Sequence, residues 1–348
     1  MADAFRINGV SIAPGQRLTI DLPVTKLYTH TEMGMPVHVI RGKRPGPRLF
    51  ICAAIHGDEI NGVEIIRRLL RSPRLNAIRG TLIAIPIVNV HGLLQHSRYL
   101  PDRRDLNRSF PGSERGSLAA RLAHLFMTEI VEKCTHGIDL HTGAVHRSNL
   151  PHIRANLDDA ETTRLAQEFH VPLLLNSNLH DGSLRQRAAE RGMPMLLYEG
   201  GEGLRFDEVA IRAGERGIIS VMRALGMLPA LKKRRRQAAP VVARSSYWVR
   251  APVSGIFRPL VKLGGRVKRD GLLGVVTDPF GDREEEVLAA MSGIVLGRSN
   301  LPLANEGDGL FHVARVHRPD DVAAQVEEFQ EFHQPGISDE PDAGSPIR

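Results

Sequence analysis

The chain has 348 residues, of which 42% are hydrophobic and 24% charged, and this is the composition of ordinary globular proteins. Its length favours two domains, each large enough to bury a core. Arginines spread along the whole chain give a formal net charge of +7, which suits anionic small substrates. No apolar run reaches the roughly 18 residues of a membrane span, and the N-terminus lacks the basic start and apolar core of a secretory signal. We therefore expect a cytoplasmic protein that binds neither membranes nor nucleic acid.

The two cysteines, Cys52 and Cys134, are too few for a disulfide framework, and they lack the spacing of a zinc-binding pair. Any bound metal must therefore be held by histidines and carboxylates.

Short apolar runs alternate with longer helical patterns from about Arg48 to Gly226. Strands are expected at 48–55, 81–88, 137–143, 171–176 and 194–200, and helices at 61–71, 117–134, 158–170 and 207–225. Continuous apolar runs between helices are typical of strands buried on both faces of a largely parallel sheet. The first domain, residues 1–229, is therefore expected to be of the α/β class.

A basic run, Lys232 to Arg236, lies in the next segment, residues 230–246. It sits between the end of the last expected helix and the sequence "QAAPVVARSS". We interpret it as a solvated linker in preference to a nucleic-acid patch.

Residues 247–316 are rich in glycine and β-forming residues, and they contain a repeat. "APVSGI" at 251–256 recurs as "AAMSGI" at 289–294, and "DGLLGV" at 270–275 recurs as "DGLFHV" at 308–313. Both pairs share one offset, which indicates two similar β-halves related by a pseudo-twofold axis. The segment resembles the barrel-sandwich domains that carry biotin or lipoate.

The hairpin between these halves, "TDPFGDREEEV", lacks the lysine that such carrier domains modify. We therefore expect a structural or substrate-gating module without an attached cofactor. Residues 317–348 are expected to be a partly disordered tail, since they end in "QPGISDEPDAGSPIR", which is rich in proline, glycine and acids.

Three chemically suitable side chains follow three expected strands. His56 begins an H-x-x-E pattern with Glu59, His141 lies in "GIDLHTG", and Glu199 lies in "PMLLYEGG". Ligands of open α/β sheets bind at the carboxyl ends of the strands, so these residues are expected to share one site.

Two imidazoles and a carboxylate are a standard catalytic zinc set, which makes His56, Glu59 and His141 candidate ligands. Glu199, with two glycines after it, is the candidate general base. Each residue also has a simpler interpretation. His56 and Glu59 could form a capping pair between strand and helix, His141 could be a satisfied core histidine, and Glu199 could form a salt bridge at a strand end.

Asp139 precedes His141 by two residues and is expected on the same side of the strand. It could orient an imidazole, or it could be a paired acid near the sheet end.

The loop "HSRYLPDRRDLNRSFPG", residues 96–112, lies between the two parts of the candidate metal set. Asn107 and Arg108 could hold a substrate carboxylate, because arginine binds carboxylates bidentately and asparagine adds a neutral donor. The alternative is a surface loop whose arginines pair with Asp102 and Asp105.

The order H-x-x-E, D-L-N-R-x-F-P-G and D-L-H-T-G resembles the succinylglutamate desuccinylase/aspartoacylase family. The resemblance covers roughly residues 48–226 and extends to the family's C-terminal β-domain. It implies a zinc carboxypeptidase-like mixed sheet with helices on both faces, and one zinc ion on His56, Glu59 and His141. It further implies that Glu199 is general base and acid, and that Asn107 and Arg108 bind a substrate carboxylate.

The resemblance also implies an upstream arginine that polarises the scissile carbonyl. Arg98 is our choice, with Arg103 or Arg104 as alternatives because of the spacing to Asp105. Arg154, in "LPHIRANL", could be a specificity contact or a surface residue. The "YEGG" sequence departs from the single glycine that often follows this glutamate in the family.

The expected activity is hydrolysis of a small N-acylated substrate that bears a carboxylate. Two other interpretations remain: a metallocarboxypeptidase with the same site, and a non-catalytic binding module that uses the basic surface. The acyl group, the amine and any homo-oligomeric state are not specified by these patterns.

Overall fold

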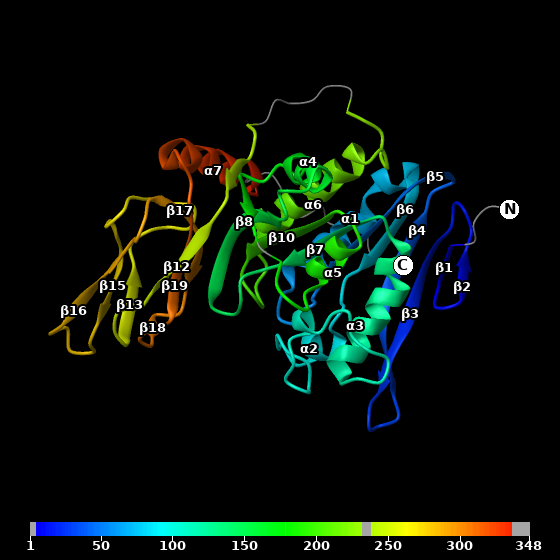
Figure 1. Cartoon of the computed structure of the whole chain (residues 1–348), viewed down its shortest axis with the longest axis horizontal. Coiled ribbons are helices and arrows are strands. Elements are labelled where there is room, and N and C mark those ends of the chain that lie inside the picture. The colour runs from blue at the N-terminus through cyan, green and yellow to red at the C-terminus, as the bar shows by residue number, and fades with distance from the viewer. Residues whose placement is uncertain (1–4, 178, 232–237, 336–348) are drawn as a thin grey trace.

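One mixed β-sheet runs through most of the molecule (Figure 1). The structure is a computed structural model that describes residues 5–177, 179–231 and 238–335. Ten strands follow one path in the order β12-β19-β17-β8-β10-β7-β5-β6-β4-β3, and β9, β11 and β14 pair beside that path.

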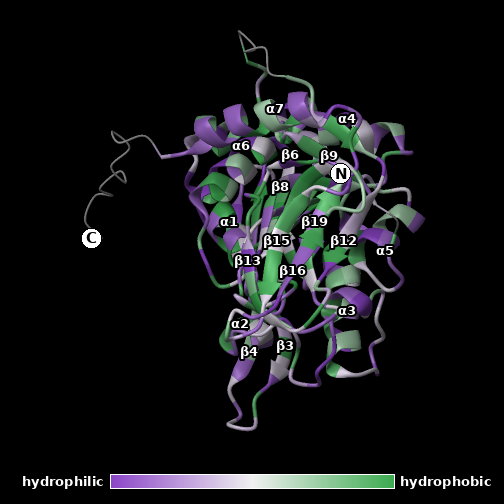
Figure 2. Cartoon of the chain, turned by 90° about the vertical axis from the view of Figure 1, so that its left-hand side faces the viewer, coloured by the Kyte–Doolittle hydropathy of each residue, from purple (hydrophilic) through white to green (hydrophobic). Residues whose placement is uncertain are grey.

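The centre of the sheet is parallel. It consists of β6 (Arg79–Ile85), β5 (Arg44–Ala53), β7 (His136–His141) and β10 (Met195–Gly201). These strands are nearly continuous apolar runs because both faces of the sheet are covered. Figure 2 shows hydrophobic residues along strands in the middle of the molecule. The expectation of buried central strands is confirmed.

The flanks of the sheet are antiparallel, so the sheet is mixed, as the family resemblance implied, and not largely parallel. On one side lie β4 (Glu32–Arg41) and β3 (Arg17–Lys26). On the other side β8 (Arg147–Ala155) runs antiparallel to β10, and β9 (Leu173–Asn176) and β11 (Val241–Ala243) continue beside it in parallel.

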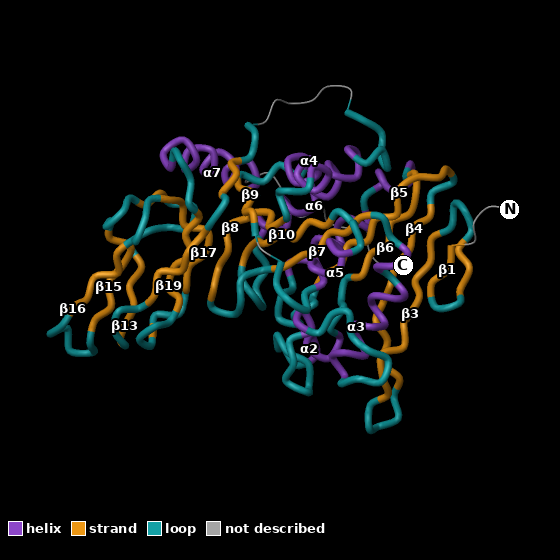
Figure 3. The backbone as a smooth tube through the Cα atoms, in the orientation of Figure 1, coloured by secondary structure: helices purple, strands orange, loops and turns teal. Residues whose placement is uncertain are grey.

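Helices cover both faces of this sheet (Figure 3). On one face α1 (Asn61–Arg71), α4 (Ala160–Glu168) and α6 (Glu208–Ala224) share a hydrophobic core with the central strands. On the other face α3 (Leu118–Glu129) and α5 (Leu184–Glu190) form a second core. The predicted α/β class with helices on both faces is confirmed.

Four of these helices begin at a side-chain cap. Ser117, Asp159, Ser183 and Asp207 each accept a hydrogen bond from the backbone N–H three residues further on. Such caps satisfy donors that have no partner within the helix, and each typically stabilises a helix by about 1 kcal/mol.

Shorter elements complete this part of the chain. They are the hairpin β1 (Phe5–Ile7) and β2 (Val10–Ile12), α2 (Val90–Leu94), and 3₁₀ turns at Pro73–Ala77, Leu106–Arg108 and Val131–Lys133.

The C-terminal β-region contains two groups of four strands. The first is β12 (Ser246–Arg250), β13 (Gly255–Pro259), β14 (Arg266–Val267) and β15 (Leu272–Thr277); the second is β16 (Glu284–Leu288), β17 (Gly293–Ser299), β18 (Leu303–Ala304) and β19 (Gly309–Ala314). Equivalent strands of the two groups make equivalent pairs. The pair β12–β19 corresponds to the pair β16–β15, and the pair β14–β17 corresponds to the pair β18–β13. The predicted internal repeat is confirmed.

The β-region is not a detached unit, because β17 pairs with β8 and so joins the central sheet. Part of the expected connection at 230–246 also belongs to the central sheet, since β11 within it pairs with β9. The basic run Lys232 to Arg236 lies outside the described residues.

The segment expected to be a partly disordered tail contains a helix, α7 (Pro319–His333), which packs on α6 and β17. Its apolar positions Val322 and Val326 are buried in a core with β17 and β19, and this accounts for the helix. The expectation for residues 336–348 concerns residues outside those described. No helix in the described parts of the chain is both long and apolar enough to cross a bilayer.

Candidate active site

His56, Glu59 and His141 meet at the carboxyl edge of the central sheet. His56 and Glu59 lie in the connection between β5 and α1, and His141 is the last residue of the neighbouring strand β7. One ligand atom from each side chain can be chosen so that all three lie within 4.8 Å of one another. All three side chains are buried.

Glu59 links the two imidazoles. Its Oε1 lies 2.7 Å from His56 Nδ1, and its Oε2 lies 2.7 Å from His141 Nδ1. Burial alone would raise the pKa of Glu59, but the attraction of the two histidines outweighs burial and lowers it. Glu59 is therefore an anion in this arrangement.

The interpretation of His56 and Glu59 as a helix cap is wrong. The residue at the N-cap of α1 is Ile60, and no side chain caps this helix. Glu59 instead accepts a hydrogen bond from the backbone N–H of Thr142, at the end of β7.

Each histidine contacts a further carboxylate through its other ring nitrogen. Asp139 Oδ2 lies 2.8 Å from His141 Nε2, and Asp105 Oδ1 lies 3.1 Å from His56 Nε2. Burial would lower the pKa of His141, but Asp139 and Glu59 outweigh it and raise that pKa well above its usual value. Asp139 thus touches the imidazole, which is one of the two roles considered for it, whereas Asp105 was considered only as a partner of the loop arginines.

This donor set fits a divalent metal ion. Two imidazoles and one carboxylate match a catalytic zinc set, and metal-binding histidines commonly donate their second N–H to a carboxylate. His56 and His141 both have that arrangement, with Nδ1 toward the centre of the cluster and Nε2 on an aspartate.

Of the three candidate upstream arginines, Arg98 reaches this cluster. Its guanidinium donates to Glu59 Oε1 at 3.2 Å and to Asp105 Oδ2 at 3.0 Å. Arg103 and Arg104 are exposed, and Arg104 lies 3.8 Å from Asp102.

Glu199 lies beside the cluster. It is within β10, and not just past a strand as expected, and it pairs directly with His141 on β7. Its two oxygens accept from Asn149 Nδ2 at 2.9 Å and Arg154 at 3.4 Å, so the salt bridge considered for this residue is present. Arg154 is therefore not a surface residue without a role, and Asn149 was missed because only the pairing of β8 with β10 brings it here.

Asn107 and Arg108 lie in the 3₁₀ turn after Asp105. Asn107 is buried, and its Oδ1 accepts from the backbone N–H of Leu184 at the start of α5. Arg108 is exposed and donates to the backbone carbonyl of Asn107 at 2.6 Å. The amide oxygen of Asn107 thus supports the fold, while the side chain of Arg108 is accessible to solvent.

A positive field surrounds this side of the site. Burial lowers the pKa of His180, and Arg108, Arg154 and Arg185 lower it further. Arg185, a buried arginine that the sequence patterns did not single out, has its pKa lowered to about 10 by burial and by Arg154. These arginines converge only in the folded chain, which favours an anionic group near them.

Comparisons with known proteins identify the family to which the chain is similar. The model of the succinylglutamate desuccinylase/aspartoacylase catalytic domain matches residues 45–225, more than half of the chain. An N-alpha-acetyl-L-2,4-diaminobutyric acid deacetylase of Halomonas elongata is 27% identical over 81% of this chain and 86% of that protein. A succinylglutamate desuccinylase of Pseudomonas aeruginosa is 22% identical over 56% of this chain and 55% of its own length.

Among solved structures, a succinylglutamate desuccinylase/aspartoacylase from Rhodobacter sphaeroides superposes with a TM-score of 0.77 at 25% identity, covering 87% of this chain and 96% of that one. The family match and the fold agree. The chain belongs to the succinylglutamate desuccinylase/aspartoacylase family.

Proposed function

We propose that this chain is a zinc-dependent deacylase that hydrolyses the amide bond of a small N-acyl amino acid or related N-acyl amine. The observation that carries the proposal is the buried convergence of His56, Glu59 and His141, with Glu199 paired to His141 on the next strand. The Halomonas relative, whose name states an N-acetyl amino acid substrate, supports the same class of reaction.

His56, Glu59 and His141 would hold one zinc ion, with Asp105 and Asp139 orienting the two imidazoles. Zinc bound there would polarise the acyl carbonyl and lower the pKa of a water molecule toward about 7.

Glu199 acts as the proton carrier in this proposal. It takes a proton from the water that attacks the acyl carbon and passes it to the departing amine nitrogen, so that amide and water become carboxylic acid and amine. Asn149 and Arg154 hold its carboxylate in place from β8.

The arginines bind and orient the substrate. Arg98, adjacent to Glu59, is positioned to donate to the developing oxyanion. Arg108 and Arg154, with the amide of Asn107, would bind a substrate carboxylate, and the field that lowers the pKa of His180 favours that anion.

We further propose the division expected from the sequence, with a catalytic domain at 1–229, a connection at 230–246 and a barrel-sandwich-like domain at 247–316. The strands of residues 247–316 belong to two sheets that share one hydrophobic core, and this suits a barrel-sandwich-like domain. Since β17 is hydrogen-bonded to β8, which carries Asn149 and Arg154, the β-domain would support the wall of the site and gate substrate entry. A cytoplasmic location stays a prediction.

The test is a substrate screen with the zinc-loaded protein. N-acetyl, N-succinyl and other N-acyl amino acids are incubated with it, and released amine is measured. We expect amine release from at least one such substrate, lost after chelation and restored by zinc. Release of C-terminal residues from peptides alone would indicate a carboxypeptidase, and protein purified without stoichiometric zinc and retained on nucleic acid would indicate a binding module.

A further inference from the structure

A pocket lies at the opposite end of the central strands from the candidate metal centre. It has a volume of about 870 Å³ and lies around the starts of β5 and β6, the turn Pro73–Ala77, and the C-terminal end of α6. β5 runs ten residues from Arg44 at this pocket to Ala53, near His56, which corresponds to about 30 Å. The pocket is therefore separate from the proposed active site.

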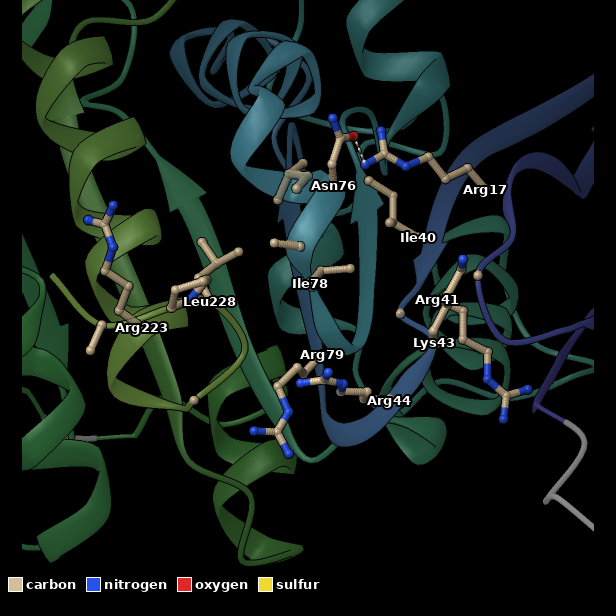
Figure 4. A pocket seen from close by; sticks show the side chains of 17 residues that line it. Arg17, Ile40, Arg41, Lys43, Arg44, Asn76, Ile78, Arg79, Arg223 and Leu228 are labelled. Atoms are coloured by element: carbon tan, nitrogen blue, oxygen red, sulfur yellow. Dashed lines mark hydrogen bonds between the residues drawn. The ribbon is translucent and has the colours of Figure 1, made fainter.

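Its lining is strongly basic. Among the 17 residues that line it there is no aspartate or glutamate, and six are cationic: Arg17, Arg41, Lys43, Arg44, Arg79 and Arg223. Figure 4 shows these side chains around the margin of the pocket, with Ile40, Ile78 and Leu228 between them. Such a ring of cations attracts anions.

Two of the arginines are direct neighbours in the sheet. Arg44 on β5 and Arg79 on β6 are register partners, and Figure 4 shows their side chains next to each other. Like charges placed opposite each other destabilise a sheet. In the described chain neither guanidinium has a carboxylate within 4 Å, and both side chains are exposed, so that a ligand can reach them.

Arg223 faces the same pocket from α6. Its Nε is buried and makes no hydrogen bond within the described protein, and burial together with Arg74 lowers its pKa. A cation in the last turn of a helix is favoured by the helix dipole, which accounts for Arg223 by itself. The dipole does not account for Arg44 and Arg79, which belong to strands.

The floor of the pocket indicates what kind of anion it suits. Ala77, Pro229 and Ala230 are the exposed apolar residues of the lining, and a small inorganic ion would gain nothing from contact with them. The volume is within the range of pockets that hold small organic ligands, about 300–1,000 Å³. Several cations around an apolar floor suit a ligand with an organic body and more than one phosphate group.

We propose that this pocket binds an organic polyphosphate of the nucleoside triphosphate class. Arg44 and Arg79 clamp the phosphate chain, and Arg223 and Lys43 contact it from either side. The organic part rests on the exposed apolar residues Ala77, Pro229 and Ala230. Ligand binding balances the repulsion between Arg44 and Arg79, so it stabilises the start of the sheet.

The test is titration calorimetry of the full chain with ATP, inorganic triphosphate and adenosine. The double variant Arg44→Glu/Arg79→Glu is compared with Arg121→Glu/Arg283→Glu. The second variant changes the net charge by the same amount, at exposed arginines outside the pocket. Arg223→Gln serves as a second pocket variant on a different element. Thermal melting without ligand shows whether each variant folds.

We expect saturable binding of ATP by the unmodified protein, weaker binding of triphosphate, and a Kd raised by about tenfold or more in the pocket variants. The surface double variant should stay within about twofold. His141→Ala should bind ATP as the unmodified protein does, and Arg44→Glu/Arg79→Glu should keep deacylase activity.

Three results would overturn the proposal. The first is the absence of saturable binding by the unmodified protein. The second is an equal loss in the pocket and surface variants, which would show diffuse attraction. The third is loss of binding in His141→Ala, which would place the nucleotide at the metal centre. Because the deacylase assay is separate, failure here leaves the proposed function unaffected.

Discussion

The two ends of the central strands differ in whether their charged side chains have partners of opposite charge. At the carboxyl ends, the buried imidazoles of His56 and His141 are each matched by two carboxylates, so opposite charges meet at 2.7 to 3.1 Å. At the amino ends, Arg44 and Arg79 are neighbours without a carboxylate within 4 Å in the described chain. The protein supplies the balancing charge at the first end and leaves it to a ligand or solvent at the second.

This difference separates two kinds of binding site. The cluster at the carboxyl ends is held together by its own ion pairs, and a metal ion would replace attractions between its members. The basic pocket has no such internal attractions, so an anion there would relieve repulsion. Substitutions at the two ends should therefore have opposite effects on the protein without ligand.

The largest effect is expected for His141→Ala. Removal of this imidazole leaves two ligands, and we expect the zinc content to fall from one ion per chain to nearly none, with amine release at the background rate. His136→Ala, at the other end of the same strand, is the control, and it should keep both its zinc content and its amine release. Zinc is measured by elemental analysis, and retention of stoichiometric zinc by His141→Ala would remove His141 from the ligand set.

A smaller effect is expected for Asp105→Asn and Asp139→Asn. Each change weakens the orientation of one imidazole, which typically costs about 10–100-fold in metal affinity. Competition with a zinc chelator measures that affinity, and Asp158→Asn, at an exposed position, is the control. Unchanged affinity in both variants would show that the aspartates only support the fold.

The stability of the β-region should depend on pH through His312. Burial lowers the pKa of His312 to about 3, and His152, Arg154 and Arg147 contribute to the shift. Histidine in an unfolded chain titrates near 6.5, so between these two values the unfolded state binds more protons. The free energy of unfolding should therefore fall as pH drops below about 6.5, by at most about 1.4 kcal/mol per pH unit from this group.

Urea unfolding at pH 7 and pH 5 measures this dependence. His312→Gln removes the titrating group and should flatten the pH dependence, whereas His317→Gln, at an exposed histidine nearby, should not. An identical dependence in His312→Gln and the unmodified protein would contradict the interpretation.

The smallest effect is expected for Arg44→Gln. Removing one member of the Arg44 and Arg79 pair should raise the free energy of unfolding by about 0.2–1 kcal/mol at low salt. Arg121→Gln is the control for a general loss of charge. A decrease for Arg44→Gln would mean that this guanidinium is stabilised by contacts other than those described.

Much of the fold could be predicted because the central strands are uninterrupted apolar runs. The segments around Ile51, Ile83 and Leu196 are buried on both faces, and burial of this kind is visible in sequence. Strand β8 was missed because "RSNLPHIRA" combines buried positions with polar ones that face the site. Helix α7 was missed because its weak apolar pattern makes sense only against β17 and β19.

The residues of the candidate site likewise divide into those that could be predicted from the sequence and those that could not. His56, His141 and Glu199 could be predicted because each lies at the carboxyl end of a strand, where chain topology brings them together. Asp105, Asn149 and Arg185 could not, since their roles depend on loop conformation and on the antiparallel pairing of β8 with β10. No local pattern distinguishes such residues from ordinary polar ones.

The central claim is that Glu199 carries the proton while His56, Glu59 and His141 hold the metal. Glu199→Gln keeps the size of the side chain and removes its basicity, and Glu190→Gln, at an exposed position, is the control. The decisive measurement is amine release together with zinc content for the same preparation of Glu199→Gln. We predict no amine release above background with zinc still at one ion per chain. Turnover close to that of the unmodified protein, or loss of the zinc, would contradict this account.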